Sequence, residues 1–387
     1  MPDNFELKSI EYIGNGILVV NDSDRGLLVH PKMPEWLIMR YIELTLDSGR
    51  KRNKFVLSLT DKCNIRCDYC CHPYQNSEFS DYDAIRLVAQ AAKMDFVEIC
   101  LTGGEPLLKG TLVLEIARIC QKAGIMLGVI TNGWWAKDYN YARDLATAMI
   151  QNGVGRVTFS WDPSHGKYIE PRTISNGIKA CMEAGMKVTL TGSFKKKNDC
   201  HENYGIDYSE YKQYANFVVC SHNISPTGLA LKLNGYYKPD TPENRIKEFR
   251  CPCFHRGNDL VLYSQDGLAM PCCSVYSGYD MKALRIGDWR KNSVSELFDN
   301  QMSDGYYRVI NDRGFIELYR LLKREIPSVF PKLPKLHNML SACQCCKIIM
   351  NLPESQDIRS VCQQYLEKRF FSKIQEKMPQ LQSLLKS

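Results

Sequence analysis

An alternation of strand-like and helix-like segments between residues 53 and 233 constrains the fold of this chain more than any other feature. Short runs rich in β-branched and aromatic residues, such as KFVLSLT at 54–60, each precede a longer segment with helical spacing of apolar residues. This unit recurs about every 30 residues. Because parallel strands need a crossover helix, the rhythm predicts βα units around a parallel sheet, an α/β fold with a partial (β/α)6 barrel. The predicted strands are 54–60, 96–103, 125–133, 156–162, 187–193 and 227–233, and the predicted helices are 80–93, 111–123, 138–152, 172–184 and 207–217.

The segments on either side of this region have a different pattern. The N-terminal sequence IEYIGNGILVVNDSDRGLLVHP alternates as a small β meander does, and PEWLIMRYIELTLDSG then has helical spacing. After Pro239 the βα rhythm ends, and a hairpin-like DLVLYSQDGLAMPCC, a helical SVSELFDN and a cysteine-bearing amphipathic region follow. We therefore expect three parts: residues 1–52, a meander and a helix; residues 53–237, the barrel; and residues 238–387, a C-terminal domain with a helical end.

Composition narrows the class of protein. Hydrophobic residues are 44% and charged residues 24% of the 387 residues, as in a folded globular protein. No apolar run is long enough to span a membrane, and the first residues lack a signal-peptide pattern, so we expect a cytoplasmic protein. The net charge of +7 is spread along the chain, and this does not indicate nucleic-acid binding.

The cysteine content points to metal. Seventeen cysteines in a cytoplasmic chain should be reduced thiols, and grouped thiolates there usually hold metal. Five are isolated among apolar or mixed neighbours, which predicts packing roles: Cys100, Cys120, Cys181, Cys200 and Cys220. The other twelve fall in two groups, at 63–71 and at 251–362.

The first group contains a C-x3-C-x2-C motif directly after the first predicted strand. Its cysteines, Cys63, Cys67 and Cys70, can bind three corners of a cubane iron–sulfur cluster and leave the fourth iron without a protein ligand. Structural zinc is the alternative, but zinc prefers four protein ligands, and His72 is too close to Cys70 to be a good fourth. The spacing favours an iron–sulfur site and leaves zinc open.

A second motif follows the second predicted strand, where Gly103-Gly104-Glu105-Pro106 forms a turn. Together with CNIRCDYC, this turn resembles the radical S-adenosylmethionine (radical SAM) enzymes over roughly residues 53–235. The resemblance implies a 4Fe-4S cluster whose open iron binds S-adenosylmethionine (SAM), and cleavage of SAM to methionine and a 5'-deoxyadenosyl radical that takes a hydrogen atom from a substrate.

The SAM-binding residues are predicted from the ends of the strands. The glycines would allow close approach of the backbone to the ligand, and Glu105 would meet its ammonium group. Thr131, Asn132, Ser160 and Asp162 have hydroxyl, amide and carboxylate groups suited to ribose hydroxyls, with helix capping as the structural alternative. The full predicted set is Tyr69, Gly103, Gly104, Glu105, Pro106, Thr131, Asn132, Ser160, Asp162 and Gly228.

The second cysteine group resembles the SPASM and twitch extensions of radical SAM enzymes. Cys253 is followed after thirteen residues by Gly267 and after four more by Cys272, and Cys343-x2-Cys346 comes later. The chain lacks the remaining cysteines of the full SPASM pattern, so we expect one auxiliary cluster, of the 4Fe-4S type, held by Cys253, Cys272, Cys343 and Cys346. Cys251 in place of Cys253 and zinc on the same thiolates remain alternatives. So do two clusters on the eight cysteines Cys251, Cys253, Cys272, Cys273, Cys343, Cys345, Cys346 and Cys362.

Two of these cysteines are adjacent to predicted ligands. Cys273 and Cys345 cannot easily point to the same metal as their neighbours, since successive side chains of an extended chain face opposite ways. Either thiol, if it faces the barrel mouth, is a candidate hydrogen-atom donor to a substrate radical.

These features together predict a radical SAM enzyme that modifies a peptide or protein, by cross-linking, epimerisation or oxidation. A dehydrogenase or epimerase acting on a small alcohol or sugar is the alternative, and a non-catalytic iron–sulfur or zinc scaffold is a third. The expected partners are the peptide or small-molecule substrate and an electron donor such as flavodoxin or ferredoxin.

Overall fold

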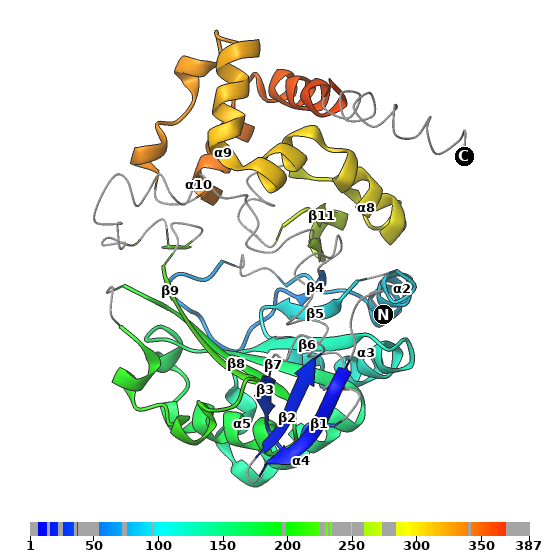
Figure 1. Cartoon of the computed structure of the whole chain (residues 1–387), viewed down its shortest axis with the longest axis vertical. Coiled ribbons are helices and arrows are strands. Elements are labelled where there is room, and N and C mark those ends of the chain that lie inside the picture. Colours follow the sequence, from blue (N-terminus) through cyan, green and yellow to red (C-terminus); the bar gives the residue numbers. More distant parts are fainter. Residues whose placement is uncertain are drawn as a thin grey trace.

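The fold is drawn in Figure 1 from a computed structural model. It describes residues 7–13, 16–21, 26–34, 54–71, 76–94, 96–195, 199–224, 259–272, 284–339 and 342–368, together with Leu37, Leu229, Ala230, Leu233 and Phe249. None of the described helices combines the length and the apolarity needed to cross a membrane.

A nine-stranded sheet forms the body of the molecule, in the order β12-β11-β10-β4-β5-β6-β7-β8-β9. The six strands from β4 to β9 are parallel, which confirms the α/β fold and the first five predicted strands. They are β4 (Lys54–Thr60), β5 (Glu98–Gly103), β6 (Met126–Thr131), β7 (Val154–Ser160), β8 (Lys187–Phe194) and β9 (Phe217–Asn223).

The position predicted for the sixth strand is wrong. Strand β9 ends before residues 227–233 begin, and Leu229 and Ala230, which are described within that range, are in a 3-10 turn. The helix predicted at 207–217 is replaced by the short η5 (Ser209–Tyr211). The run Phe217-Val218-Val219 favours a strand, because β-branched side chains lose rotamer freedom in a helix.

Four helices connect the parallel strands and confirm the other helix predictions. Ser80 and Asp138 cap two of them, accepting hydrogen bonds from the backbone N–H groups of Asp83 and Tyr141. Each helix buries an apolar face against the sheet, and the isolated Cys120 and Cys181 are packed in these faces, as predicted. The helices are α2 (Asp81–Ala91), α3 (Gly110–Lys122), α4 (Tyr139–Gln151) and α5 (Pro171–Glu183), and short 3-10 helices follow the strands: η1 (Pro106–Lys109), η2 (Trp134–Lys137), η3 (His165–Lys167) and η4 (His201–Tyr204).

The C-terminal half contributes strands to the same sheet. The predicted hairpin is present as β10 (Leu260–Tyr263) and β11 (Leu268–Met270), joined through η7 (Gln265–Gly267), and β12 (Gly287–Asp288) follows. Strand β10 pairs in parallel with β4, so the barrel sheet continues into a segment that the sequence assigns to another part. The boundary predicted near residue 238 lies outside the described residues and stays a prediction.

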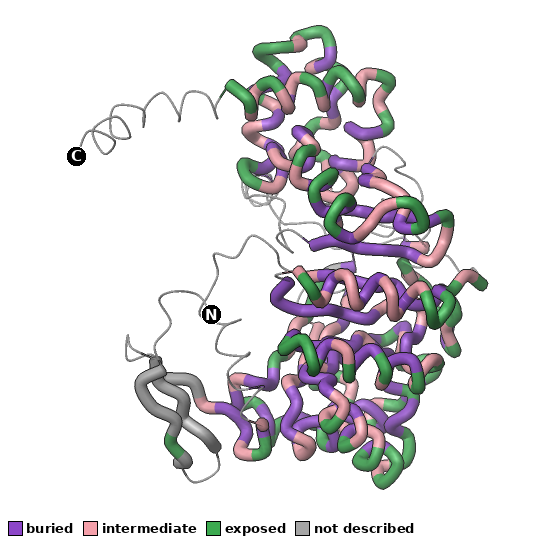
Figure 2. The backbone as a smooth tube through the Cα atoms, turned by 90° about the vertical axis from the view of Figure 1, so that its right-hand side faces the viewer, coloured by how far each residue is buried: buried purple, intermediate pink, exposed green. Residues whose placement is uncertain are grey.

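The C-terminal helices enclose a second hydrophobic core. They are α8 (Val294–Ser303), α9 (Gly305–Glu325), α10 (Ala342–Met350) and the helical residues 355–368, with the short η9 (Phe330–Lys332) and η10 (Leu336–Asn338). Helix α8 begins with a capping box between Ser293 and Glu296. Figure 1 shows α9 and α10 beyond strand β11, and Figure 2 shows buried residues in this region, where the second core lies.

The predicted N-terminal meander is a separate three-stranded antiparallel sheet of β1 (Leu7–Ile13), β2 (Gly16–Asn21) and β3 (Gly26–Val29). Backbone contacts join it to the segment before β9: Ala215 N–H donates to Leu28 C=O over 2.8 Å, and His30 N–H donates to Asn216 Oδ1 over 2.9 Å. Apart from residue 34 and Leu37, the helix predicted after the meander lies outside the described residues.

Candidate active site

A cavity of about 610 Å³ occupies the interior of the barrel. Every second residue of the inner strands faces it, because side chains alternate across a strand. On β7 these residues are Arg156, Thr158 and Ser160, and on β8 they include Thr189 and Thr191. The cavity therefore reaches from the amino ends of the strands to the loops at their carboxyl ends.

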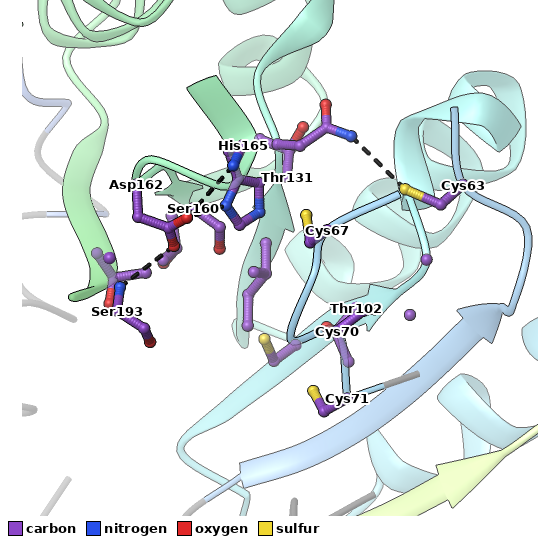
Figure 3. Close-up of a pocket in the computed structure, with 18 of the residues that line it drawn as sticks. Cys63, Cys67, Cys70, Cys71, Thr102, Thr131, Ser160, Asp162, His165 and Ser193 are labelled. Atoms are coloured by element: carbon purple, nitrogen blue, oxygen red, sulfur yellow. Dashed lines mark hydrogen bonds and ion pairs between the residues drawn. The ribbon is translucent and has the colours of Figure 1, made fainter. Parts of the chain in front are cut away.

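Cys63, Cys67 and Cys70 all line this cavity, as the first motif predicts (Figure 3). Their loop follows β4, and Cys70 N–H donates to Cys67 C=O over 3.2 Å, which turns the chain between these two ligands. Burial raises the pKa of the Cys63 and Cys67 thiols, and the neighbouring cysteines raise both further. Thiolates at these positions therefore need a positively charged partner, as metal ions provide.

These residues fit a cubane cluster better than a single metal ion. Among the residues that the structure describes, no three Cys, His, Asp or Glu side chains are grouped to hold one ion. The three thiolates of a cubane bind three different irons, so they need a common cavity and not a common centre. Cys63, Cys67 and Cys70 would hold such a cluster.

The Gly103-Gly104 turn packs directly on the start of the cysteine loop. Gly104 N–H donates to Thr60 C=O over 2.6 Å, and Glu105 N–H donates to Lys62 C=O over 2.9 Å. A Cβ atom would lie 2.3 Å from the Thr60 oxygen at Gly103, whose φ is +133°, and 2.1 Å from the Lys62 oxygen at Gly104. Both glycines also line the cavity, but the observed close approach is to the protein's own backbone.

Glu105 connects two loops through its side chain. Its side chain is fully buried and does not line the cavity. It accepts hydrogen bonds from Thr131 Oγ1 at 2.9 Å, Asn132 N–H at 2.8 Å and Leu107 N–H at 3.1 Å. Burial raises the pKa of Glu105 to about 7, although these hydrogen bonds oppose the rise. The carboxylate thus joins two loops in this structure, and its expected contact with the SAM ammonium group stays a prediction.

Pro106 likewise does not face the cavity. It is the buried first residue of η1, a position that proline's fixed φ suits. Its contribution is to the shape of the turn rather than to a ligand surface.

Asn132 lies beside the cysteine loop as well as at the end of β6. Its Nδ2 donates to Asn64 Oδ1 over 2.8 Å and lies 3.7 Å from Cys63 Sγ. Its Oδ1 accepts from Trp134 N–H in a local turn, and Gly133, not Asn132, is the N-cap of η2. Thr131 is similarly engaged, because its Oγ1 accepts from Gly133 N–H. Both residues line the cavity, where we predicted them.

Asp162 is the centre of a buried hydrogen-bond network at the cavity wall. Its Oδ1 lies 2.9 Å from His165 Nδ1, its Oδ2 accepts from Ser193 N–H over 3.2 Å, and Tyr69 is also hydrogen-bonded to it. Burial would raise the pKa of Asp162, but the hydrogen bonds from His165 and Tyr69 outweigh it and lower the pKa. The carboxylate is thus held ionised.

The loop after β7 also clamps the cysteine loop. Ser164 Oγ accepts from Asp68 N–H over 2.6 Å, and Lys167 Nζ lies 2.6 Å from the Asp68 carboxylate. Because Asp68 stands between two of the predicted ligands, these contacts fix the loop that would hold the cluster. Tyr69, Ser160 and Asp162, which were predicted to bind SAM, all line the cavity. Tyr69 and Asp162 also belong to the hydrogen-bond network that holds the cysteine loop.

The second cysteine group is only partly described. Cys346 is buried and accepts a hydrogen bond from the Tyr306 hydroxyl over 3.4 Å, while Cys272 and Cys343 are half-buried. Cys345 is fully buried in the C-terminal core, 3.6 Å from the Tyr319 hydroxyl, and is not among the cavity-lining residues. The structure therefore does not place Cys345 where a hydrogen-atom donor is needed. Gly228, Cys251, Cys253 and Cys273 lie outside the described residues.

Several cavity residues were not predicted from the sequence. Lys54 and Arg156 line the cavity, and so do Cys71, Cys100 and Cys220, of which Cys100 and Cys220 were expected only to pack. The two-residue alternation of β7 would have identified Arg156 from Ser160. No local sequence pattern identifies Asp259 or Tyr263 as cavity residues, because they reach the cavity through the pairing of β10 with β4.

Comparisons with known proteins agree with this site. A family model described as the radical SAM superfamily matches residues 57–201. The chain is 34% identical over 311 residues to a GTP 3',8-cyclase of Campylobacter jejuni (strain RM1221), covering 68% of this chain and 94% of the relative. It is 24% identical over 313 residues to the "Putative peptide biosynthesis protein YydG" of Bacillus subtilis (strain 168), covering 78% of this chain and 93% of the relative.

A solved structure described as native anSMEcpe with bound AdoMet and Cp18Cys peptide aligns with a TM-score of 0.48 and 15% identity, over 80% of this chain and 99% of that chain. The family model covers the cysteine motif, the turn after β5 and strands β5 to β8. The relative from C. jejuni is matched over almost its whole length. The chain therefore belongs to the radical SAM superfamily and is an enzyme that uses a 4Fe-4S cluster and SAM.

Proposed function

We propose that this enzyme cleaves SAM reductively and removes a hydrogen atom from a peptide or protein substrate, to cross-link, epimerise or oxidise it. The observation that carries the first part is the placement of Cys63, Cys67 and Cys70 in one cavity with the Gly103-Gly104 turn. The peptide substrate is supported by the relative named as a putative peptide biosynthesis protein, which is matched over 93% of its length.

The chain's own residues would act by positioning. Cys63, Cys67 and Cys70 would hold the cluster, and when bound the cluster supplies the electron that splits SAM into methionine and a 5'-deoxyadenosyl radical. Ser160 and Asn132 line the wall where the nucleoside would lie. The network around Asp162 holds the cysteine loop in place.

A small-molecule substrate remains the second candidate. The relative from C. jejuni has a nucleotide substrate in its name, and its identity to this chain is higher than that of the peptide-associated relative. The barrel cavity of about 610 Å³ is also large enough for a small ligand.

We also propose one auxiliary iron–sulfur cluster on Cys253, Cys272, Cys343 and Cys346. The support is the cysteine pattern and the partial exposure of Cys272 and Cys343, which leaves them accessible to a cluster. A thiolate set of this kind would suit the transfer of an electron released in an oxidation. Cys273 stays a candidate hydrogen-atom donor.

SAM cleavage is tested on anaerobically reconstituted protein given dithionite and SAM. We expect methionine and 5'-deoxyadenosine in equal amounts, and none from a variant with Cys63, Cys67 and Cys70 replaced by alanine. A Cys200→Ala variant is the control, because Cys200 is half-buried and outside the cavity. Equal product from the triple variant would contradict the proposal.

The substrate class is tested by co-expression with each short open reading frame near the gene. We expect one encoded peptide to change its mass, or to gain deuterium when the cells grow in deuterated water. The change should disappear with the triple cysteine variant. Unchanged peptides, together with a hydrogen-abstraction product from a metabolite extract, would establish the small-molecule alternative.

A further inference from the structure

Five charged side chains gather at the amino ends of the barrel strands, at the opposite end of the cavity from the cysteine loop. Glu98 is 2% exposed, and its two oxygens lie 3.1 Å from Lys54 Nζ and 2.5 Å from Arg156 Nη2. Lys187 begins β8 and is paired in register with Arg156, and Asp259 directly precedes β10. Here these residues are called the barrel floor.

The barrel floor carries more positive than negative charge. Its three cations, Lys54, Arg156 and Lys187, exceed its two carboxylates, Glu98 and Asp259, by one charge. Burial lowers the pKa of Lys187 to about 8, and the nearby Arg156 lowers it further. A set of buried charges that served only to close the barrel would be more stable if it were balanced.

The excess charge faces the cavity. Lys54 and Arg156 line it together with one carboxylate, Asp259, whereas Glu98 and Lys187 do not. Above them Thr158 and Thr189 present hydroxyl groups to the same space, so polar groups continue from the barrel floor toward the carboxyl ends of the strands. A ligand that enters past the cysteine loop therefore meets these hydroxyl groups, beside apolar wall residues such as Val56, Ile130 and Val261, on its way to the two cations.

We infer that the barrel floor binds an anionic group of the substrate, a carboxylate or a phosphate, through Arg156 and Lys54. This rests on the proposed function, in which the cavity is the active site. The planar guanidinium of Arg156 suits an oxyanion. Lys54 adds a second positive charge, since it contacts the other carboxylate oxygen of Glu98. Arg156 and Ser160 are four residues apart on β7, so the anion would bind roughly 13 Å below the strand ends. The substrate would accordingly be elongated, with its anionic group remote from the carbon that reacts.

The test is titration calorimetry of the anaerobic holoenzyme with inorganic phosphate and, separately, with acetate, in the absence of SAM. The variant is the double substitution Glu98→Gln and Arg156→Gln, which keeps a neutral polar pair at the buried position. Lys54→Gln is a second variant, and Arg118→Gln is the charge control, because Arg118 lies on the surface outside the cavity and donates to Asn152 Oδ1.

We expect one saturable site in the wild type and in Arg118→Gln, and about tenfold weaker binding in Lys54→Gln and in the double variant. Tighter binding of phosphate than of acetate would identify a phosphate-bearing substrate, and the reverse a carboxylate. No saturable binding by the wild type, or equal binding by folded wild type and double variant, would overturn the inference. Because SAM is absent, this result is independent of whether SAM is cleaved.

Discussion

The Glu105 carboxylate accepts a hydrogen bond from the Thr131 hydroxyl over 2.9 Å, and this bond joins the turn after β5 to the loop after β6. The other Glu105 oxygen accepts from Asn132 N–H on the same loop. A motif residue that the sequence suggests as a ligand contact thus fixes the relative position of two loops around the cavity.

Replacing Thr131 with valine should lower the free energy of unfolding by about 1–2 kcal/mol, because a buried hydrogen bond is lost at nearly constant volume. Urea unfolding of the anaerobic protein measures the change. The control is Thr147→Val on the exposed face of α4, where the hydroxyl bonds only to Arg143 C=O and the effect should be near zero. Equal effects at the two positions would show that the Glu105 contact adds nothing.

Replacing Gly104 with alanine should displace the cysteine loop, because the new Cβ would lie 2.1 Å from the Lys62 carbonyl oxygen. We expect iron content to fall by about half, with only the first of two clusters lost. Gly110→Ala is the matched control, since no atom lies within 4 Å of a Cβ there. Iron and sulfide analysis after anaerobic reconstitution decides the matter, and full iron retention by Gly104→Ala would refute the packing argument.

Replacing Cys63, Cys67 and Cys70 together with alanine should likewise remove about half of the iron, or all of it if no auxiliary cluster exists. The remaining iron would then be assigned by a further Cys346→Ala substitution. Absorbance and electron paramagnetic resonance of the reduced protein check the cluster type. A triple variant with the iron content of the wild type would place the cluster on other cysteines.

Lys187 should make stability depend on pH. Its pKa is lowered to about 8 by burial, below the ordinary value of 10.5, so the unfolded state binds more protons between these values. The free energy of unfolding should therefore rise with pH through this window, and the full penalty below pH 8 is about 3 kcal/mol.

A Lys187→Met variant should lack this contribution and be more stable than the wild type at pH 7. Urea unfolding at pH 7 and pH 9.5 gives the change in unfolding free energy with pH for each protein. The cysteines contribute equally to the wild type and the variant, so the difference between the two changes reports Lys187 alone. Lys122→Met, at the exposed end of α3, should keep the wild-type slope. If Lys187→Met also keeps it, the charge of Lys187 is not penalised in the folded protein.

The strands and the first site motif were predictable because their signals are local. Each of β4 to β8 is a short run of β-branched and apolar residues, and the cysteine motif follows β4 without a gap. The sixth strand was misplaced because 217–223 and 227–233 both have strand-forming residues, and only pairing with β8 distinguishes them. The side-chain directions of Glu105 and Cys345 depend on packing and could not be obtained from spacing.

The amino-acid sequence by itself determined the parallel α/β barrel, the superfamily and the three thiols of its first cluster, since helix and strand periodicity and short motifs are encoded over a few neighbouring residues. Only the tertiary structure decided what else meets those thiols. The pairing of β10 with β4 brings Asp259 and Tyr263 to the cavity, although they lie about 200 residues from β4 in the chain. The register of this strand pair sets which residues become neighbours. Likewise, the pairing of β4, β5, β6 and β7 in one sheet assembles Lys54, Glu98 and Arg156 on one floor. Pairing between distant strands depends on the burial of entire sheet and helix faces, so it cannot be predicted from a local sequence pattern.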